Sequence, residues 1–123
     1  MTESEETPSY EWECFQVLAY ELPDDDPSEA ERKIRARLRR KKLGTYDQSR
    51  IAVLRELKNF LQLEISERGQ QSRYYSGSTR ATADFEDFRM DGMAQDLSRK
   101  FPNIPPVEIR RAVSFAVFIY HIR

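Results

Sequence analysis

Apolar residues recur at intervals of three and four along residues 47–67, and this spacing constrains the fold more than any other feature of the chain. The expected buried face consists of Ile51, Leu54, Leu57, Lys58, Leu61 and Ile65, and Val53 and Phe60 widen it. Because an α-helix turns once in about 3.6 residues, this spacing places the side chains on one face. We therefore predict a long helix that is capped by Asp47 or Ser49 and packs its apolar face against other helices.

Four more segments of helical character are separated from this one by Pro, Gly and acidic runs. We predict an all-α fold, a compact bundle of about five helices over residues 8–21, 28–43, 47–67, 83–100 and 106–122. Thr7 is the expected first cap, Thr82 or Asp84 the cap of the fourth helix, and Gly44 the end of the second. The alternative is an α+β fold with a short terminal strand or strands, because residues 10–14 alternate in polarity and residues 112–122 are rich in β-branched and aromatic side chains.

Length and composition predict a single domain. A chain of 123 residues with 39% hydrophobic residues can bury a core without disulfides, and its one cysteine, Cys14, suits a reducing compartment. No stretch approaches the length of uncharged apolar sequence that crosses a bilayer, so we expect a cytoplasmic protein without membrane contact. We expect a mobile acidic N-terminus over residues 1–7, one helical domain over residues 8–123, and an exposed loop over residues 69–81.

Charge is distributed unevenly along the first 42 residues. Residues 32–42 contain 8 of the 20 Lys and Arg residues, whereas residues 1–31 contain 11 carboxylates and no basic residue. Ala30, Ile34 and Leu38 form a narrow apolar stripe, which predicts a helix that is basic around most of its circumference. This helix suits a phosphate backbone, an acidic protein surface, or simple contact with solvent. Its candidate contacts are Arg32, Lys33, Arg35, Arg37, Arg39, Arg40, Lys41 and Lys42.

A second group of candidate contacts lies in the predicted loop and consists of Arg73, Tyr74, Tyr75 and Arg80. Tyrosine rings stack on unpaired bases and arginines hold phosphates, so this group can belong to a nucleic-acid surface. Tyr and Arg are also enriched at protein interfaces, and a segment rich in Ser and Gly also serves as a plain connector.

Five acids on two predicted helices raise an enzymatic alternative. Glu64 and Glu67 are three residues apart on one predicted helix, and Asp84, Asp87 and Asp91 are spaced by three and four residues on the next. Their layout resembles the paired acidic motifs of the all-α nucleotide pyrophosphatases, and this resemblance implies a Mg²⁺ site and hydrolysis of nucleotides. Acids in a first helical turn also have a purely structural role, because their negative charge interacts favourably with the partial positive charge at the helix N-terminus. Since Cys14 and His121 are the only Cys and His, the chain offers no common zinc site, and we predict no catalytic residue, metal or cofactor.

The leading interpretation is a small non-enzymatic regulatory or assembly factor that acts by binding a protein partner. The first alternative is a nucleic-acid-binding protein that uses the basic helix 32–42, and the second is the Mg²⁺-dependent enzyme. Residues 112–122 are apolar around most of the helix, which predicts either a central core helix or a homodimer contact through the C-terminal helix. We also hypothesise that the acidic residues 1–31 compete with an anionic partner for the basic helix.

Overall fold

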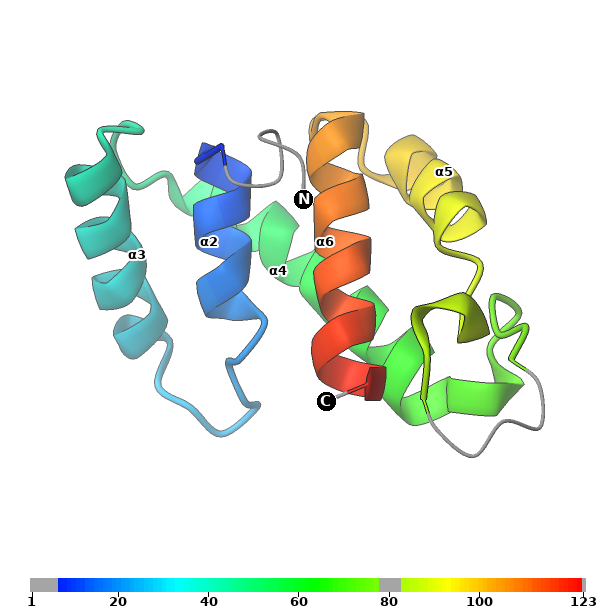
Figure 1. Ribbon diagram of the computed structural model, residues 1–123. Helices are drawn as coiled ribbons and strands as arrows, with labels where there is room; N and C mark the ends of the chain where they lie inside the picture. Colours follow the sequence, from blue (N-terminus) through cyan, green and yellow to red (C-terminus); the bar gives the residue numbers. More distant parts are fainter. Residues whose placement is uncertain (1–6, 78–82, 123) are drawn as a thin grey trace. The chain divides into compact units, whose positions relative to one another are not determined.

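The computed structural model describes residues 7–77 and 83–122, which form helices joined by turns (Figure 1). The α-helices in this part of the chain are α2 (Tyr10–Leu18), α3 (Pro27–Lys41), α4 (Gln48–Gln62), α5 (Met90–Lys100) and α6 (Pro106–Val117). The predicted all-α class is confirmed. The described residues contain no strand, only an isolated antiparallel bridge between Tyr75 and Phe88, so the α+β alternative does not hold for them. Residues 1–6 of the predicted mobile start and residues 78–81 of the predicted loop lie outside the described residues.

Two predicted helices continue beyond their α-helical part as π-helical segments. Segment η1 (Leu63–Arg68) follows α4, and segment η4 (Phe118–Ile122) follows α6. With these continuations, the predicted helices 47–67 and 106–122 agree with the observed elements to within one residue at each end.

The helix predicted over residues 83–100 begins later than expected. Asp84 does act as a cap, but it caps the short 3-10 turn η3 (Phe85–Asp87), and its own N–H donates to the Asp87 carboxylate at 3.0 Å. Phe88 then adopts an extended backbone with φ −120° and ψ 141°, and α5 begins only at Met90. The capping signal in the sequence was correct, but the turn it begins ends after three residues because Phe88 enters the antiparallel bridge.

Internal contacts divide the chain into two compact units, Met1–Glu56 and Leu57–Arg123, and the division falls within α4. Unit 1 contains α2, α3 and the first part of α4. Unit 2 contains the rest of α4, the short segments, α5 and α6. The expectation of one domain over residues 8–123 stays a prediction.

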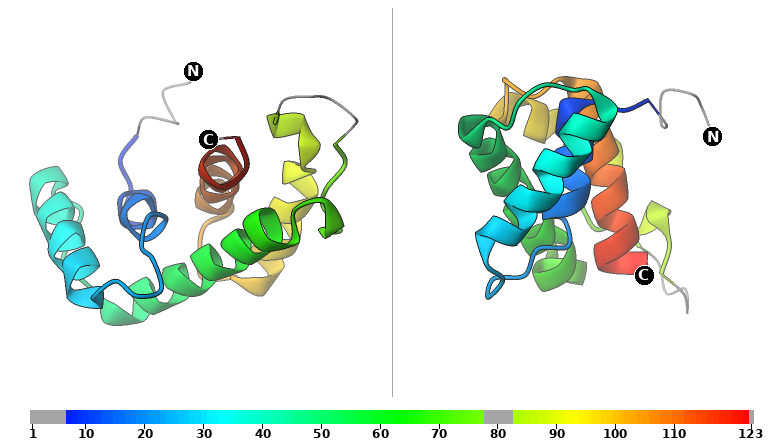
Figure 2. Two further views of the ribbon diagram at one scale, coloured as in Figure 1. Left: turned by 90° about the horizontal axis from the view of Figure 1, so that it is seen from below. Right: turned by 90° about the vertical axis from the view of Figure 1, so that its left-hand side faces the viewer.

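In unit 1, α2 and α3 lie side by side (Figure 2). Ser9, and not the predicted Thr7, caps α2: its hydroxyl accepts a hydrogen bond from the Trp12 N–H at 3.0 Å. The Tyr10 hydroxyl connects α2 to the start of α4, because it donates to the Thr45 carbonyl and accepts from the Asp47 N–H. The buried apolar residues of this unit are Tyr10, Cys14, Phe15, Leu18, Ala19, Ala30, Ile34, Leu38, Ile51 and Leu54.

The C-cap of α3, Lys42, lies two residues before the predicted stop at Gly44. Lys42 adopts the left-handed backbone that ends the helix, with φ 57° and ψ 46°. The Leu43 N–H then donates to the Leu38 carbonyl at 3.0 Å and occupies one of the acceptors that a helix end leaves free. The sequence favoured Gly44 because glycine adopts a positive φ without steric cost, and Gly44 does so here at φ 114°.

In unit 2, α5 and α6 lie side by side (Figure 1). The segment after η2 (Gly69–Gln71) is held to the η3 region by two backbone hydrogen bonds. The Arg89 N–H donates to the Tyr74 carbonyl at 2.8 Å, and the Ser76 N–H donates to the Asp87 carbonyl at 2.6 Å. The buried apolar residues of this unit are Leu57, Leu61, Ile65, Tyr74, Phe88, Met93, Ala94, Leu97, Phe101, Ile104, Ile109, Ala112, Val113, Ala116 and Val117.

The apolar residues of α6 are largely buried, as expected for a core helix. Two large apolar side chains near its ends remain exposed, Val107 at 55% and Phe118 at 40%. The homodimer contact through this helix stays a prediction. Among the described residues, no helix has the length and apolarity needed to cross a membrane.

Candidate functional site

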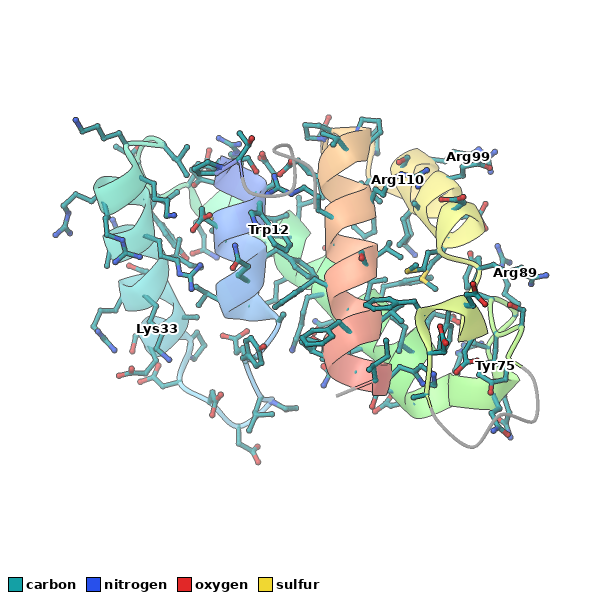
Figure 3. The ribbon with its side chains drawn as sticks, in the orientation of Figure 1. Trp12, Lys33, Tyr75, Arg89, Arg99 and Arg110 are labelled. Carbon is teal, nitrogen blue, oxygen red and sulfur yellow. The ribbon has the colours of Figure 1, made fainter. Side chains whose placement is uncertain are left out.

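The basic helix of the sequence is α3, and it is oriented as predicted. Ala30, Ile34 and Leu38 are buried, because they form the stripe with which α3 packs into unit 1. Seven of the eight candidate cations are exposed: Arg32, Lys33, Arg35, Arg39, Arg40, Lys41 and Lys42. Figure 3 shows the side chains of α3, with Lys33 labelled.

Arg37 differs from the other cations of α3 because it is tied to the neighbouring helix. Its Nη1 lies 3.2 Å from Oε1 of Glu13, whose side chain is only 6% exposed. A buried carboxylate is costly unless a donor or a cation binds it, so Arg37 stabilises Glu13 in place. We assign Arg37 to the packing of α2 against α3 and not to a contact surface.

Two further arginines have exposed partners on the same helix. Arg32 lies 3.0 Å from Glu29, and Arg35 lies 2.9 Å from Glu31, with the Arg35 guanidinium also 4.5 Å from the centre of the Tyr46 ring. Exposed pairs of this kind contribute only about 0–1 kcal/mol, so a partner with stronger acceptors can displace them. These two ion pairs reduce the net charge of the N-terminal half of α3, but they leave its arginines accessible to a partner.

The last turn of α3 has a different character. Arg39, Arg40, Lys41 and Lys42, which we call the basic end of α3, are exposed and have no carboxylate partner among the described residues. Lys33 also lacks such a partner and lies seven residues before Arg40, on the same side of the helix. The basic end therefore concentrates four uncompensated charges in one turn and its cap.

Five acids of residues 7–31 pair with arginines of unit 1, and none of these five pairs involves the basic end. Besides the pairs of α3, Glu11 binds Arg50, and Glu21 binds Arg55 of α4 through both oxygens, at 2.8 and 2.9 Å. The bond to Glu21 raises the pKa of Arg55. Competition between residues 1–31 and an anionic partner for the basic helix stays a hypothesis. The described acids form ion pairs with only three cations of this helix, Arg32, Arg35 and Arg37.

The second group of candidate residues is built into unit 2. Tyr74 is 5% exposed and its hydroxyl donates to Oδ2 of Asp96 at 2.6 Å, so its ring is not presented to a base. Tyr75 is half-buried and packs edge-on against Phe88, with ring centres 5.3 Å apart. Arg73 is exposed, while Arg80 lies outside the described residues. The segment predicted as an exposed loop is therefore partly packed, because two tyrosines find partners on α5 and after η3.

Arg73 and Tyr74 line a pocket of about 310 Å³ that the sequence did not predict. Its other lining residues are Phe60, Glu64, Arg68, Asp96, Leu97 and Lys100. Phe60, Glu64 and Arg68 recur every four residues, as do Asp96 and Lys100, so two helical faces meet here. This spacing was visible in the sequence, but nothing in it indicated that the two faces lie opposite each other.

Asp96 is the most heavily bonded carboxylate of this pocket. It accepts from the Tyr74 hydroxyl at 2.6 Å, from Arg73 at 2.7 Å and from Arg99 at 3.0 Å. The hydrogen bonds from Tyr74 and Arg73 lower the pKa of the Asp96 carboxyl. Burial, followed by the hydrogen bond to Asp96, raises the pKa of Tyr74. At neutral pH the network therefore consists of a carboxylate, a neutral phenol and two guanidinium ions.

Three of the five acids of the enzymatic alternative have separate partners in the structure. Glu64 accepts from the Ser72 hydroxyl at 2.7 Å, Oδ2 of Asp87 lies 2.8 Å from Nε2 of His121, and Asp91 pairs with Arg110. In the described part of the chain, no three Cys, His, Asp or Glu side chains are grouped closely enough to hold a metal ion. Within the described residues, the five acids are therefore not gathered into one such group, and the enzymatic alternative stays a prediction.

Comparison of the chain with models of protein families, with curated proteins and with solved structures found no match.

Proposed function

We propose that this protein acts by binding and not by catalysis, and that the basic end of α3 is its contact surface for an acidic segment of a protein partner. One observation carries the proposal. Four consecutive cations, Arg39 to Lys42, are exposed without a carboxylate partner among the described residues, while the arginines nearer the start of α3 have theirs. Uncompensated surface charge of one sign attracts a partner of the opposite sign and speeds its association.

An acidic protein segment suits this surface better than a long phosphate backbone because α3 has two oppositely charged ends. Residues 24–31 contain five acids, and residues 32–42 contain eight bases. A duplex that followed the whole helix would meet Asp24, Asp25 and Asp26 at one end, and these acids repel phosphate. A short acidic segment can bind the basic end alone, and its carboxylates match the guanidinium forks of Arg39 and Arg40.

Nucleic acid is the second candidate, and one observation favours it. Lys33 and Arg40 lie on the same side of α3, so the cations that lack a carboxylate partner extend over about two turns of the helix. A short stretch of single strand could contact them in succession, and its affinity would fall steeply with salt.

The experiment is a comparison of ligands by fluorescence anisotropy on the full chain. A labelled peptide rich in Asp and Glu is titrated beside single- and double-stranded DNA and RNA, at low and near-physiological salt. The test variant is Arg39→Ser with Arg40→Ser. The control is Arg32→Ser with Arg35→Ser, which removes the same charge from the same helix where carboxylates already compensate it.

We expect the peptide to bind more tightly than any nucleic acid at near-physiological salt. We also expect the test variant to lose at least about tenfold in affinity and the control to lose much less. Tighter binding of a nucleic acid, with a salt slope that decreases by about two in the test variant, would replace the first candidate with the second. Absence of binding to every ligand at low salt would reject both.

A further inference from the structure

The pocket of unit 2 contains two carboxylates whose acceptor capacity is largely used within the protein. Glu64 is 6% exposed, accepts from the Ser72 hydroxyl and lies 3.5 Å from Nε of Arg68. Asp96 receives three donors, from Tyr74, Arg73 and Arg99. A cationic ligand would have to compete with all of these donors, so the pocket is poorly suited to a metal ion or an amine.

The cations of the same pocket retain unused donors. Arg73 binds Asp96 and the Tyr74 hydroxyl through a single nitrogen, Nη2, which leaves Nε and Nη1 available. Arg68 is 3.5 Å from Glu64 through Nε, and its two Nη groups have no partner among the described residues. Lys100 has no carboxylate partner there either, and its ammonium lies 5.1 Å from the centre of the Phe60 ring. The donors that remain at this opening therefore favour an anion.

We propose that this pocket binds the phosphate group of a small phosphate monoester. Its three cations, Arg68, Arg73 and Lys100, come from three separate elements: η1, the segment after η2, and α5. A phosphate monoester presents three oxygens, one for each cation, whereas a carboxylate presents two.

The rest of the pocket fits an organic group attached to the phosphate. Phe60 and Leu97 supply apolar wall beside the cations. The volume of about 310 Å³ equals that of about ten water molecules in the liquid, of which a phosphate group replaces only a few. This volume lies at the lower end of the range for small-molecule sites.

This site is independent of the contact surface proposed for α3. All of its lining residues belong to unit 2, and none belongs to the basic end. The loss of one binding activity therefore says nothing about the other.

The test is a titration of the full chain, followed by ¹H–¹⁵N NMR spectra, with phenyl phosphate, inorganic phosphate and benzoate as probes. We expect phenyl phosphate to bind most tightly and to shift the amides of Arg73, Tyr74 and Lys100. Lys100→Gln and Arg73→Gln should each weaken binding at least about tenfold, because each removes a charged donor. Arg110→Gln, which removes an exposed charge from α6 outside the pocket, should leave the affinity unchanged.

Four results would overturn the proposal. The first is the absence of any shift at these amides with phenyl phosphate, and the second is equal binding of benzoate. The third is equal weakening by Arg110→Gln and Lys100→Gln, which would mean diffuse attraction to the surface. The fourth comes from a phosphoserine peptide titrated as an additional probe: its binding without binding of phenyl phosphate would reject a small-molecule ligand. Far-UV circular dichroism of each variant verifies that it is folded, and Lys100→Gln is the decisive variant because Lys100 has no ion partner in the described structure.

Discussion

Nε2 of His121 lies 2.8 Å from Oδ2 of Asp87, although 34 residues separate the two in the chain. The Asp87 side chain is only 5% exposed, and it also accepts the N–H of Asp84. The imidazole packs edge-on against Phe88, with ring centres 5.0 Å apart. This pair connects the end of the described chain to the turn before α5, so the single histidine has a structural role in unit 2.

Replacing the buried carboxylate should therefore be costly. We expect Asp87→Asn to lower the free energy of unfolding by about 1–3 kcal/mol, because an amide replaces a carboxylate that two donors face. The measurement is urea denaturation followed by circular dichroism. Asp91→Asn is the control: Asp91 is 78% exposed and pairs with Arg110 on the surface, so its loss should change stability by less than about 1 kcal/mol. Equal losses in the two variants would contradict the assignment.

Urea denaturation should also distinguish the cation of α3 that stabilises the fold from those that are exposed on its surface. We expect Arg37→Gln to cost about 1–3 kcal/mol, because it leaves the buried carboxylate of Glu13 without its cation. Arg39→Gln removes the same charge from the exposed surface and should change stability by no more than about 0.5 kcal/mol. If Arg37→Gln were as mild as Arg39→Gln, the contact between α2 and α3 would not depend on this pair.

Cys14 should be inert while the protein is folded. Burial, helped by the nearby charge of Glu11, raises the pKa of its thiol from 9.0 to about 12. At pH 8 only about one thiol in ten thousand is then ionised, and the thiolate is the reactive form. We expect no measurable reaction with Ellman's reagent in buffer within the time that the same protein needs to react fully in urea. Fast labelling of the folded chain would contradict this burial.

The same shift predicts a loss of stability in alkali. The unfolded thiol ionises above about pH 9 while the folded thiol keeps its proton, so stability that is present below pH 9 decreases as the pH rises towards 12. Between pH 9 and pH 10 this amounts to about 1 kcal/mol. The measurement compares the pH dependence of unfolding with that of Cys14→Ala, which should lack this part. Burial also raises the pKa values of Tyr10, Tyr46 and Tyr74 from 10.0. The charge of Cys14 adds to the shifts of Tyr10 and Tyr46, so of these three tyrosines only Tyr74 contributes equally to both proteins.

The left-handed backbone of Lys42 provides a stabilising substitution. This conformation costs a residue with a Cβ about 1 kcal/mol of conformational free energy, whereas glycine adopts it without this cost. We expect Lys42→Gly to raise the free energy of unfolding by about 0.5–1 kcal/mol. Lys41→Gly, one residue earlier and still inside α3, should lower stability instead, because glycine disfavours helical backbone. We therefore expect the change in the free energy of unfolding to have opposite signs in Lys42→Gly and Lys41→Gly. Changes of the same sign would mean that α3 ends at another residue.

The helices were predictable because each depends on a local pattern. The stripe of Ala30, Ile34 and Leu38 requires only that a helix present one face to the core, and the structure buries all three. The ends of the helices were less predictable. Thr7 and Ser9 are both good caps by composition, and only the structure shows that the Ser9 hydroxyl accepts the Trp12 N–H.

The pairs that build the candidate sites were not predictable, because they join segments far apart in the sequence. Tyr74 and Asp96 are 22 residues apart, and no local pattern indicates that a phenol in a Ser- and Gly-rich segment would be buried against α5. Arg37 could not be distinguished from Arg39 for the same reason, since its role depends on Glu13 of another helix. The exposure of the basic end, in contrast, follows directly from the narrow apolar stripe.

The position of the division between the two units has a practical consequence for dissecting the protein. It falls between Glu56 and Leu57, inside α4, and not in a connecting segment. Cutting the chain there would create two new helix ends, each with backbone amides or carbonyls that had partners one turn further along. A fragment with either half of α4 alone would therefore begin or end in frayed helix. The shortest fragments suitable for study are those that keep α4 intact.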